Sequence, residues 1–255
     1  MKLKHKRLAV VAAVLAAVPL RIGWAQQEQP AAPVSLEIDL AYVSKYVWRG
    51  LLVNPDPAFQ PSLTMSNPSG LSLNWWGSLD TTDVAGNEGD ITEIDYTLDY
   101  SWEHGGRTFN AGLIHYTFPH TQFASTTEGY ATVCLGGRFS PSLSVNYDFD
   151  EADGFYVSLA AGYACPIARK KGLLTSLNLS ARLSYGCADY NAFYFGAAVS
   201  ALTDMLVTAS VPIALSDRLT VTPALSYSTL IDGDLRRAVA DPDTVVAGVT
   251  VSTAF

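Results

Sequence analysis

The stretch V-S-L-E-I-D-L-A-Y-V-S-K-Y-V-W, Val34–Trp48, alternates in character with a period of two residues. Its even-numbered positions are mostly aliphatic or aromatic, whereas Glu37, Asp39 and Lys45 occupy odd-numbered positions. Successive side chains of a strand point to opposite faces, so the pattern predicts one long strand with an apolar and a charged face. Strands of soluble proteins usually have about 5–6 residues. A strand of this length, apolar outside and charged inside, is typical of a transmembrane β-barrel.

The N-terminus has the pattern of a secretory signal peptide. Basic residues between Lys2 and Arg7 precede the apolar run Leu8–Leu20, and small residues follow at the positions that a signal peptidase recognises. We therefore predict a signal peptide over residues 1–25, cleaved after Ala25, then a short lead over residues 26–33. The barrel is expected over residues 34–255, which predicts a location in the bacterial outer membrane.

The composition supports a barrel and argues against other classes. Hydrophobic residues make up 49% of the chain and charged residues only 16%, below the roughly 25% of soluble domains. After the signal, no stretch has the ~18 consecutive apolar residues that suggest a membrane helix. Removal of residues 1–25 leaves 11 basic and 24 acidic residues, a formal charge of −13. This charge argues against nucleic-acid binding, which requires a basic face.

The alternation recurs along the chain and predicts an all-β, antiparallel, up-and-down barrel of about twelve strands, with ten or fourteen as alternatives. Residues 186–204 are predicted to form a long outer loop with some strand character, because a thirteenth strand would break the even count of bacterial single-chain barrels. After the first strand, the others are predicted at residues 58–66, 71–80, 91–102, 108–118, 128–139, 143–149, 155–164, 173–185, 205–215, 219–230 and 245–255.

Ionisable residues on the polar parity form a candidate lumen lining. Charge on the lipid face costs roughly 2–4 kcal/mol for Arg or Lys at the membrane midplane, so these groups are expected to face water or one another. Two interpretations stay open: a selectivity lining, or an ion-paired network that fills a narrow lumen. Arg49-Gly50 is the most suggestive single feature, since the arginine could enter the lumen, pair with Glu128 or Asp80, or simply pack in a loop. The candidate lining is Glu37, Asp39, Lys45, Arg49, Asp80, Glu93, Asp95, Asp99, Glu128, Arg138, Asp148 and Arg182.

Aromatic residues near strand ends or on the apolar parity predict an interfacial girdle rather than a ligand-stacking surface. Three cysteines, Cys134, Cys165 and Cys187, make an odd count in an exported chain and are predicted to be free thiols. Their spacing matches no zinc site. The girdle is predicted from Tyr46, Trp48, Trp75, Tyr96, Tyr100, Trp102, Tyr147, Tyr163 and Tyr185.

Several short motifs resemble a known family. They are Y-V-W-R-G at 46–50, P-A-F-Q-P-S-L at 57–63, L-N-W-W-G-S at 73–78, H-Y-T-F-P at 115–119 and S-P-S-L-S-V-N-Y-D-F-D at 140–150. Together they resemble the porin-type family labelled TorF, which carries the Gcw_chp domain. The resemblance implies an outer-membrane β-barrel that acts as a pore. The terminal Phe255 is similar to the aromatic signal by which such barrels are recognised for assembly.

The predicted function is passive diffusion of ions or small polar solutes through a net-acidic lumen with a preference for cations. One alternative is a closed barrel that binds a ligand or partner through outer loops at 81–90, 186–204 and 231–244. An outer-membrane lipid hydrolase ranks third: His104, His115 and His120 are possible bases, but no G-x-S-x-G motif is present. We predict no catalytic residue, cofactor or metal. The expected partners are membrane lipids, lipopolysaccharide, the barrel-assembly machinery and the permeating solutes.

Overall fold

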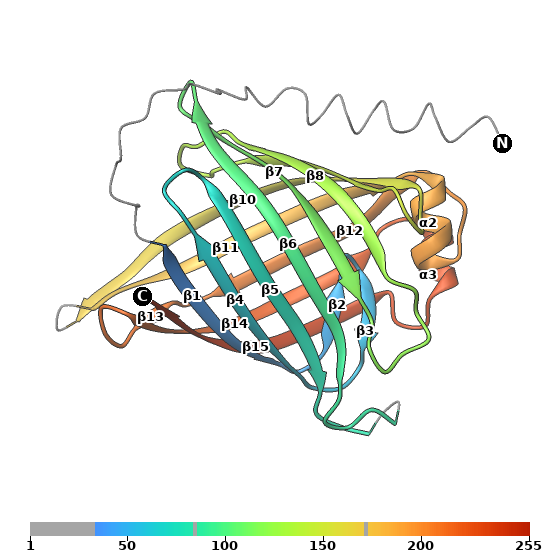
Figure 1. Cartoon of the computed structure of the whole chain (residues 1–255), viewed down its shortest axis with the longest axis horizontal. Coiled ribbons are helices and arrows are strands. Elements are labelled where there is room, and N and C mark those ends of the chain that lie inside the picture. Colours follow the sequence, from blue (N-terminus) through green and yellow to red (C-terminus); the bar gives the residue numbers. More distant parts are fainter. Residues whose placement is uncertain (1–33, 84–85, 171–172) are drawn as a thin grey trace, which may run out of the picture.

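A computed structural model describes residues 34–255 except 84–85 and 171–172. Within these residues, twelve antiparallel strands close into a barrel (Figure 1), which confirms the predicted fold class and strand count. The predicted signal peptide and lead lie outside the described residues. The barrel strands are β1 (Ser35–Val43), β4 (Ala58–Ser66), β5 (Leu71–Asp80), β6 (Ile91–His104), β7 (Arg107–Thr117), β8 (Thr126–Cys134), β9 (Ser142–Asp148), β10 (Gly154–Lys170), β11 (Leu173–Gly186), β12 (Ala201–Ser210), β14 (Leu219–Leu230) and β15 (Asp243–Ala254).

The barrel is an up-and-down meander closed by its first and last strands. β1 pairs with β4 on one side and with β15 on the other, so that Leu40 lies opposite both Pro61 and Val251. Backbone hydrogen bonds between Leu36 and Phe255 extend this seam to the end of the chain. Closure leaves no unpaired edge strand, which is the condition for a sheet to span a lipid bilayer.

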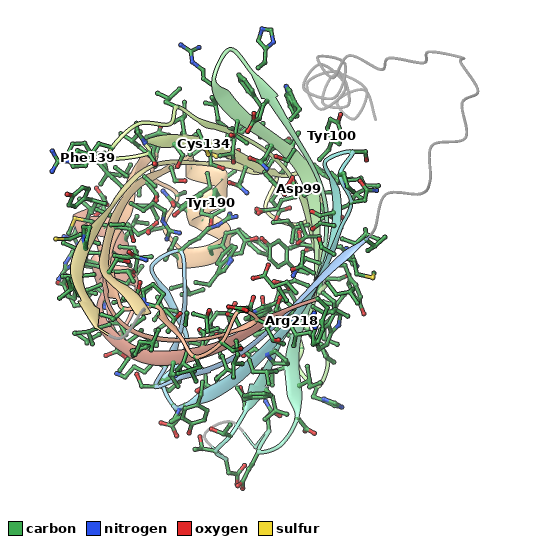
Figure 2. The ribbon with its side chains drawn as sticks, turned by 90° about the vertical axis from the view of Figure 1, so that its left-hand side faces the viewer. Asp99, Tyr100, Cys134, Phe139, Tyr190 and Arg218 are labelled. Atoms are coloured by element: carbon green, nitrogen blue, oxygen red, sulfur yellow. The ribbon has the colours of Figure 1, made fainter. Side chains whose placement is uncertain are left out.

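Alternation along each strand separates an apolar exterior from a polar interior. On β6, Tyr96 and Leu98 are 50% and 44% exposed on the outer face, whereas Glu93 is 6% exposed on the inner face. Figure 2, viewed down the barrel, shows Asp99 directed inward and its neighbour Tyr100 directed outward. The outer face is therefore suited to lipid and the inner face to water or to other polar groups.

The two rims of the barrel differ. β1 begins and β15 ends at the same rim, where β13 (Ile213–Ala214) adds a short pairing to β14. The opposite rim carries the longest connections, at residues 44–57, 187–200 and 231–242, with the helices α2 (Ala188–Phe195) and α3 (Gly233–Ala238). By analogy with barrels that have short periplasmic turns and long external loops, we call the second rim the loop rim and the first the turn rim.

The first predicted strand is shorter than expected. Pairing of β1 ends at Val43, and Ser44 still bonds to Ala247 of β15. The chain then leaves the wall and forms a separate hairpin from β2 (Tyr46–Trp48) and β3 (Leu51–Asn54). The prediction of one strand through Trp48 was therefore wrong, and residues 50–57 are not a simple loop.

The segment 186–204 also differs in part from its prediction. It lies at the loop rim as an excursion, but it contains α2, and β12 already begins at Ala201 rather than Met205. α2 ends at Phe195 and is followed by Gly196, whose φ of 75° is the left-handed conformation common after helix C-termini. Among the described helices, none is long and apolar enough to cross a membrane.

Candidate functional site

The hairpin β2–β3 lies inside the barrel toward the loop rim (Figure 1). Its two-residue turn is Arg49-Gly50, and both residues have positive φ, 46° and 87°, as a type I′ turn requires. A Cβ on Gly50 would lie 2.7 Å from Asp204 Cβ and 2.7 Å from Leu230 Cδ2 on the opposing wall. Only glycine fits this approach, so the turn is pressed against the inner face of β12 and β14.

Arg49 fastens the tip of the hairpin to the barrel wall. Its guanidinium donates to both carboxylate oxygens of Glu128 on β8, at 2.5 and 3.0 Å, and to the Tyr190 hydroxyl at 3.5 Å. Glu128 also accepts from the Tyr116 hydroxyl at 2.8 Å and from Asn146 Nδ2 at 2.9 Å. The side chains of Arg49 and Glu128 are 10% and 1% exposed, which makes this a buried, bidentate ion pair.

Aromatic rings surround the guanidinium. Arg49 Cζ lies 4.5 Å from the ring centroid of Trp48 and 4.6 Å from that of Tyr156 on β10. Trp48 also packs against Tyr194 of α2, with ring centroids 4.9 Å apart. Cation–π contacts of this kind gain strength when the cation is desolvated. The predicted assignment of Trp48 to the interfacial girdle was therefore wrong, because its ring lies within the lumen.

α2 and α3 pack over the hairpin from the loop rim. Tyr190 and Phe195 of α2, Leu235 of α3, Tyr156 and Leu230 form one buried apolar cluster, and Figure 2 shows Tyr190 within the ring of strands. Burial raises the pKa of Tyr190 and of Tyr194 well above the ordinary value of tyrosine. Both phenols therefore stay neutral, and the Tyr194 hydroxyl donates to Asp148 at 2.8 Å.

A second ion pair lies beside the turn. Arg182 of β11 donates to Asp204 Oδ2 at 2.9 Å, and the Tyr156 hydroxyl donates to Asp204 Oδ1 at 2.6 Å. The pairing of β11 with β12 shifts register here, and Thr203 and Asp204 are both fully buried. Such a bulge re-aims side chains away from strict alternation. The sequence analysis missed Asp204 because it assigned residues 186–204 to an outer loop, whereas β12 begins at Ala201.

The base of the hairpin is also bound to inner-wall carboxylates. Asn54 Nδ2 donates to Asp80 Oδ1 at 2.7 Å, and the Tyr46 hydroxyl hydrogen-bonds to Glu93. The Tyr46 ring packs against Trp76 of β5 with centroids 5.6 Å apart. Tyr46 is thus a second residue that we expected in the girdle and that the structure places in the lumen. We call residues 46–54 the plug hairpin.

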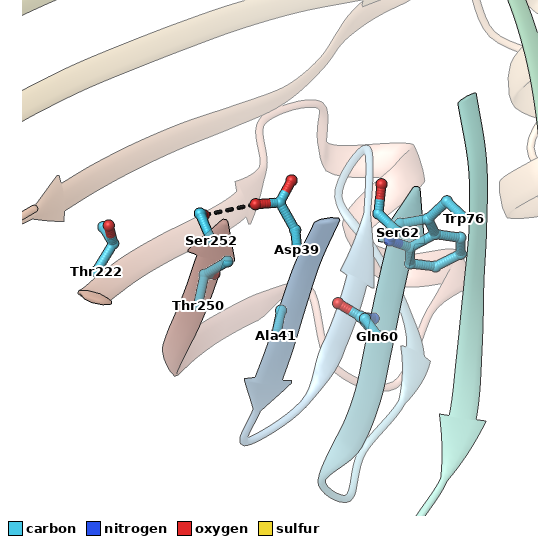
Figure 3. Close-up of a pocket in the computed structure, with 8 residues that line it drawn as sticks. All are labelled: Asp39, Ala41, Gln60, Ser62, Trp76, Thr222, Thr250 and Ser252. Atoms are coloured by element: carbon cyan, nitrogen blue, oxygen red, sulfur yellow. Dashed lines mark hydrogen bonds between the residues drawn. The ribbon is translucent and has the colours of Figure 1, made fainter. Parts of the chain in front are cut away.

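Between the plug hairpin and the turn rim, the lumen contains a cavity of about 410 Å³ (Figure 3). Its wall is formed by β1, β4, β5, β14 and β15. Asp39 accepts from the Ser252 hydroxyl at 2.5 Å across the seam of the barrel. The lining consists of Asp39, Ala41, Gln60, Ser62, Trp76, Thr222, Thr250 and Ser252.

The predicted lumen residues thus fall into separate groups. The structure brings Arg49 and Glu128 together, places Asp80, Glu93 and Asp148 around the plug hairpin and loops, and gives Arg182 the unforeseen partner Asp204. Asp39 lines the cavity, and Asp95 and Asp99 lie on the inner face of β6.

Three of the predicted lumen residues lie elsewhere or near the margins. Glu37 lies near the turn-rim end of β1, and Lys45 precedes β2 after the wall strand has ended. The prediction that Arg138 lines the lumen was wrong. Arg138 lies in the exposed turn between β8 and β9 and donates to the hydroxyl of Tyr163 on the outer face of β10. Because this contact is on the exterior, Arg138 does not line the lumen.

The possible metal ligands and the three histidines lie apart from one another in the described residues. No group of three or more His, Cys, Asp or Glu among them is placed to hold a metal ion. His104 lies at the exposed end of β6, His115 Nδ1 contacts Thr127 Oγ1, and His120 Nδ1 contacts the carbonyl oxygen of Ile91. The three cysteines are free thiols.

A closed, antiparallel barrel with an apolar exterior and a polar lumen defines an outer-membrane type of β-barrel. The chain belongs to the bacterial family described as "Bacterial protein of unknown function (Gcw_chp)", whose model matches residues 27–177, more than half of its length. The narrower label TorF remains a resemblance. No curated protein matches the sequence.

Solved porin structures share the fold. The KdgM porin superposes with a TM-score of 0.50 at 9% identity, over 87% of this chain and 99% of that one. A complex of the KdgM porin with disordered oligogalacturonate gives a TM-score of 0.52 at 8% identity, with the same coverage. The NanC porin gives 0.52 at 11% identity, over 86% of this chain and 98% of that one. At such identities the likeness concerns the fold alone.

Proposed function

We propose that the protein is an outer-membrane channel for passive diffusion of small cations and small polar solutes. The observation that carries this proposal is the unbalanced acidity of the inner wall. Among the described residues, Arg49 and Arg182 are each committed to a buried carboxylate, whereas Asp95 and Asp99 have no Lys or Arg within ion-pair distance. An acidic wall in a confined lumen attracts cations and repels anions.

The membrane location follows from the same geometry. The outer faces of the strands expose aliphatic and aromatic side chains, which supports insertion in lipid, and the family is bacterial. The partners would be membrane lipids and lipopolysaccharide outside, the assembly machinery during insertion, and ions or solutes within. The acidic wall opposes a polyanion such as the oligogalacturonate found with one of the similar porins, so we propose cations instead.

A second candidate function is a closed barrel that binds a ligand or partner through its outer loops. The plug hairpin favours this alternative, because it fills the loop-rim half of the lumen together with α2 and α3. In a channel, the same hairpin would set the narrowest part of the path.

Single-channel recording in a planar bilayer under a salt gradient tests the proposal. We expect discrete conductance steps with a cation-selective reversal potential. Asp95→Asn combined with Asp99→Asn should lower that selectivity, because it removes two of the inward carboxylates that lack a basic partner. A matched control is Asp243→Asn, which removes an exposed carboxylate at the loop rim. An unchanged reversal potential in the double variant, or silence from folded and inserted protein, would contradict the proposal, and silence would favour the closed barrel.

A further inference from the structure

We propose that the lumen holds a binding subsite for a small organic cation, formed by the indole of Trp76 between the carboxylates of Asp39 and Asp95. The inference rests on the proposed function, because a solute would reach the subsite through the same lumen. It adds a chemical class to that function: a compact ammonium ion with apolar substituents, held in the cavity beneath the plug hairpin.

The three side chains lie in one lateral row of the inner wall. Asp39 of β1 pairs with Ser62 of β4, Ser62 pairs with Trp76 of β5, and Trp76 pairs with Asp95 of β6. Neighbouring strands are about 4.8 Å apart, so the indole has one carboxylate about one strand away and the other about two strands away. All three residues share the inward parity of their strands. The row therefore places a carboxylate on each side of the indole. Asp39 lines the cavity together with Trp76, whereas Asp95 adjoins Trp76 from β6 and is not itself among the lining residues.

The hydrogen bonds of the two carboxylates leave capacity for a cation. Asp95 Oδ1 is buried and has no hydrogen-bond donor among the described residues. Asp39 uses Oδ1 to accept from Ser252, and Figure 3 shows its carboxylate directed into the cavity from the side of the seam. A buried carboxylate oxygen without a donor is costly. A bound organic cation would supply the compensating positive charge beside both carboxylates.

Trp76 decides between an organic and an inorganic cation. Its indole lines the cavity. The ring of Tyr46 in the plug hairpin packs against this indole, with an angle of 51° between the two ring planes. Tryptophan is the strongest aromatic partner for cations, and quaternary ammonium groups are a common ligand of such surfaces. A hydrated metal ion gains little from an indole face, whereas an alkylammonium ion buries methyl groups against it. The cavity volume of about 410 Å³ suits a small ligand.

Calorimetric titration of the full chain, purified in detergent, with choline tests the subsite. The control ligand is 3,3-dimethyl-1-butanol, a neutral isostere of choline in which carbon replaces the charged nitrogen. We expect saturable binding of choline and much weaker binding of the isostere. Trp76→Leu and Asp95→Asn should each weaken choline binding by about tenfold. Trp75→Leu is the control, because the adjacent Trp75 has the opposite parity on β5 and lies on the lipid face.

The outcomes distinguish this inference from the proposed function. Conductance with cation selectivity but no choline binding overturns the subsite and leaves the channel intact. Equal binding of choline and its neutral isostere overturns the cationic class and indicates a neutral polar ligand. Choline binding that is weakened about tenfold in Trp76→Leu, less in Trp76→Phe and not at all in Trp75→Leu supports the subsite even if the barrel does not conduct. Folding of each variant is verified by its circular dichroism spectrum.

Discussion

Replacement of Glu128 by glutamine tests whether the ion pair at the hairpin tip holds the plug hairpin in the lumen. The substitution preserves shape and leaves an oxygen that can still accept from the Tyr116 hydroxyl. What it removes is the charge opposite Arg49, whose side chain is 10% exposed and lies between two aromatic rings. The arginine then has no carboxylate in a site with little access to water.

The expected magnitude is large. Removing one partner of a buried ion pair costs roughly 3–5 kcal/mol, because the other charge is left uncompensated. If that cost falls on hairpin docking, the undocked population rises between about 100-fold and several thousandfold. Single-channel records of Glu128→Gln should then show long openings of higher conductance than the wild-type protein, since the loop-rim half of the lumen is no longer filled.

Two controls make the result specific. Arg49→Met with Glu128→Gln removes both charges and keeps an apolar stem between Trp48 and Tyr156, so its records should be closer to wild type than those of Glu128→Gln alone. Asp243→Asn breaks the exposed pair with Arg236 at the loop rim and should leave conductance unchanged. Conductance and gating of folded Glu128→Gln that match the wild type would refute the role of the ion pair in docking.

Two further perturbations test the placement of the wall and the hairpin. Leu98→Arg puts a charge on the lipid face, which should destabilise the inserted barrel by roughly 2–4 kcal/mol and lower the yield of assembled protein in membranes. Thr97→Arg puts the same charge on the inner face and should assemble at the wild-type yield. Equal yields of the two variants would contradict the assigned facing of β6. Gly50→Ala should destabilise the docked hairpin and raise conductance, because its Cβ would meet the β12–β14 wall, while Gly105→Ala, whose Cβ would meet nothing within 4 Å, should leave conductance at the wild-type level. Equal conductance of the two glycine variants would argue against close packing of the turn.

The wall of the barrel was predictable because its signal is local. The predicted bounds of Ala58–Ser66, Leu71–Asp80 and Leu219–Leu230 coincide with β4, β5 and β14. Each of these strands has lipid on one side and a polar lumen on the other, so two-residue alternation reports both its existence and its facing. Any apolar side chain can face lipid, so apolar residues recur regularly at every second position of these strands.

The plug hairpin was not predictable by the same signal. Tyr46 and Trp48 continue the apolar phase of β1, but they contact Trp76 and Tyr194 inside the barrel rather than lipid. Alternation cannot distinguish an apolar group that faces lipid from one that faces an aromatic cluster. The available clue was Arg49-Gly50, since a two-residue turn with positive φ at both positions favours Asn-Gly or Gly-Gly. Arginine at that position is costly, and its contact with Glu128 on a distant strand compensates for the cost.

Two interpretations of the lumen charges were open: a network of polar contacts that fills the lumen, and a lining that selects solutes. The position of the plug hairpin suggests that each applies to a different half of the barrel. Toward the loop rim, Asp80, Glu93 and Glu128 each accept from a residue of the hairpin, so their carboxylates serve to hold a polar insert within the wall. Buried polar groups of an insert need such partners, because each unsatisfied group costs free energy. Toward the turn rim, Asp39 lines an open cavity. Asp95 pairs with Tyr116 of β7 at the level of the plug hairpin and retains an oxygen without a donor among the described residues. A twelve-stranded barrel is intermediate between those filled by side chains and those with a wide aqueous channel. One half can therefore be packed while the other remains available to a solute, and neutralising the two sets of carboxylates should have opposite effects: loss at Glu128 loosens the plug, whereas loss at Asp95 weakens cation recognition.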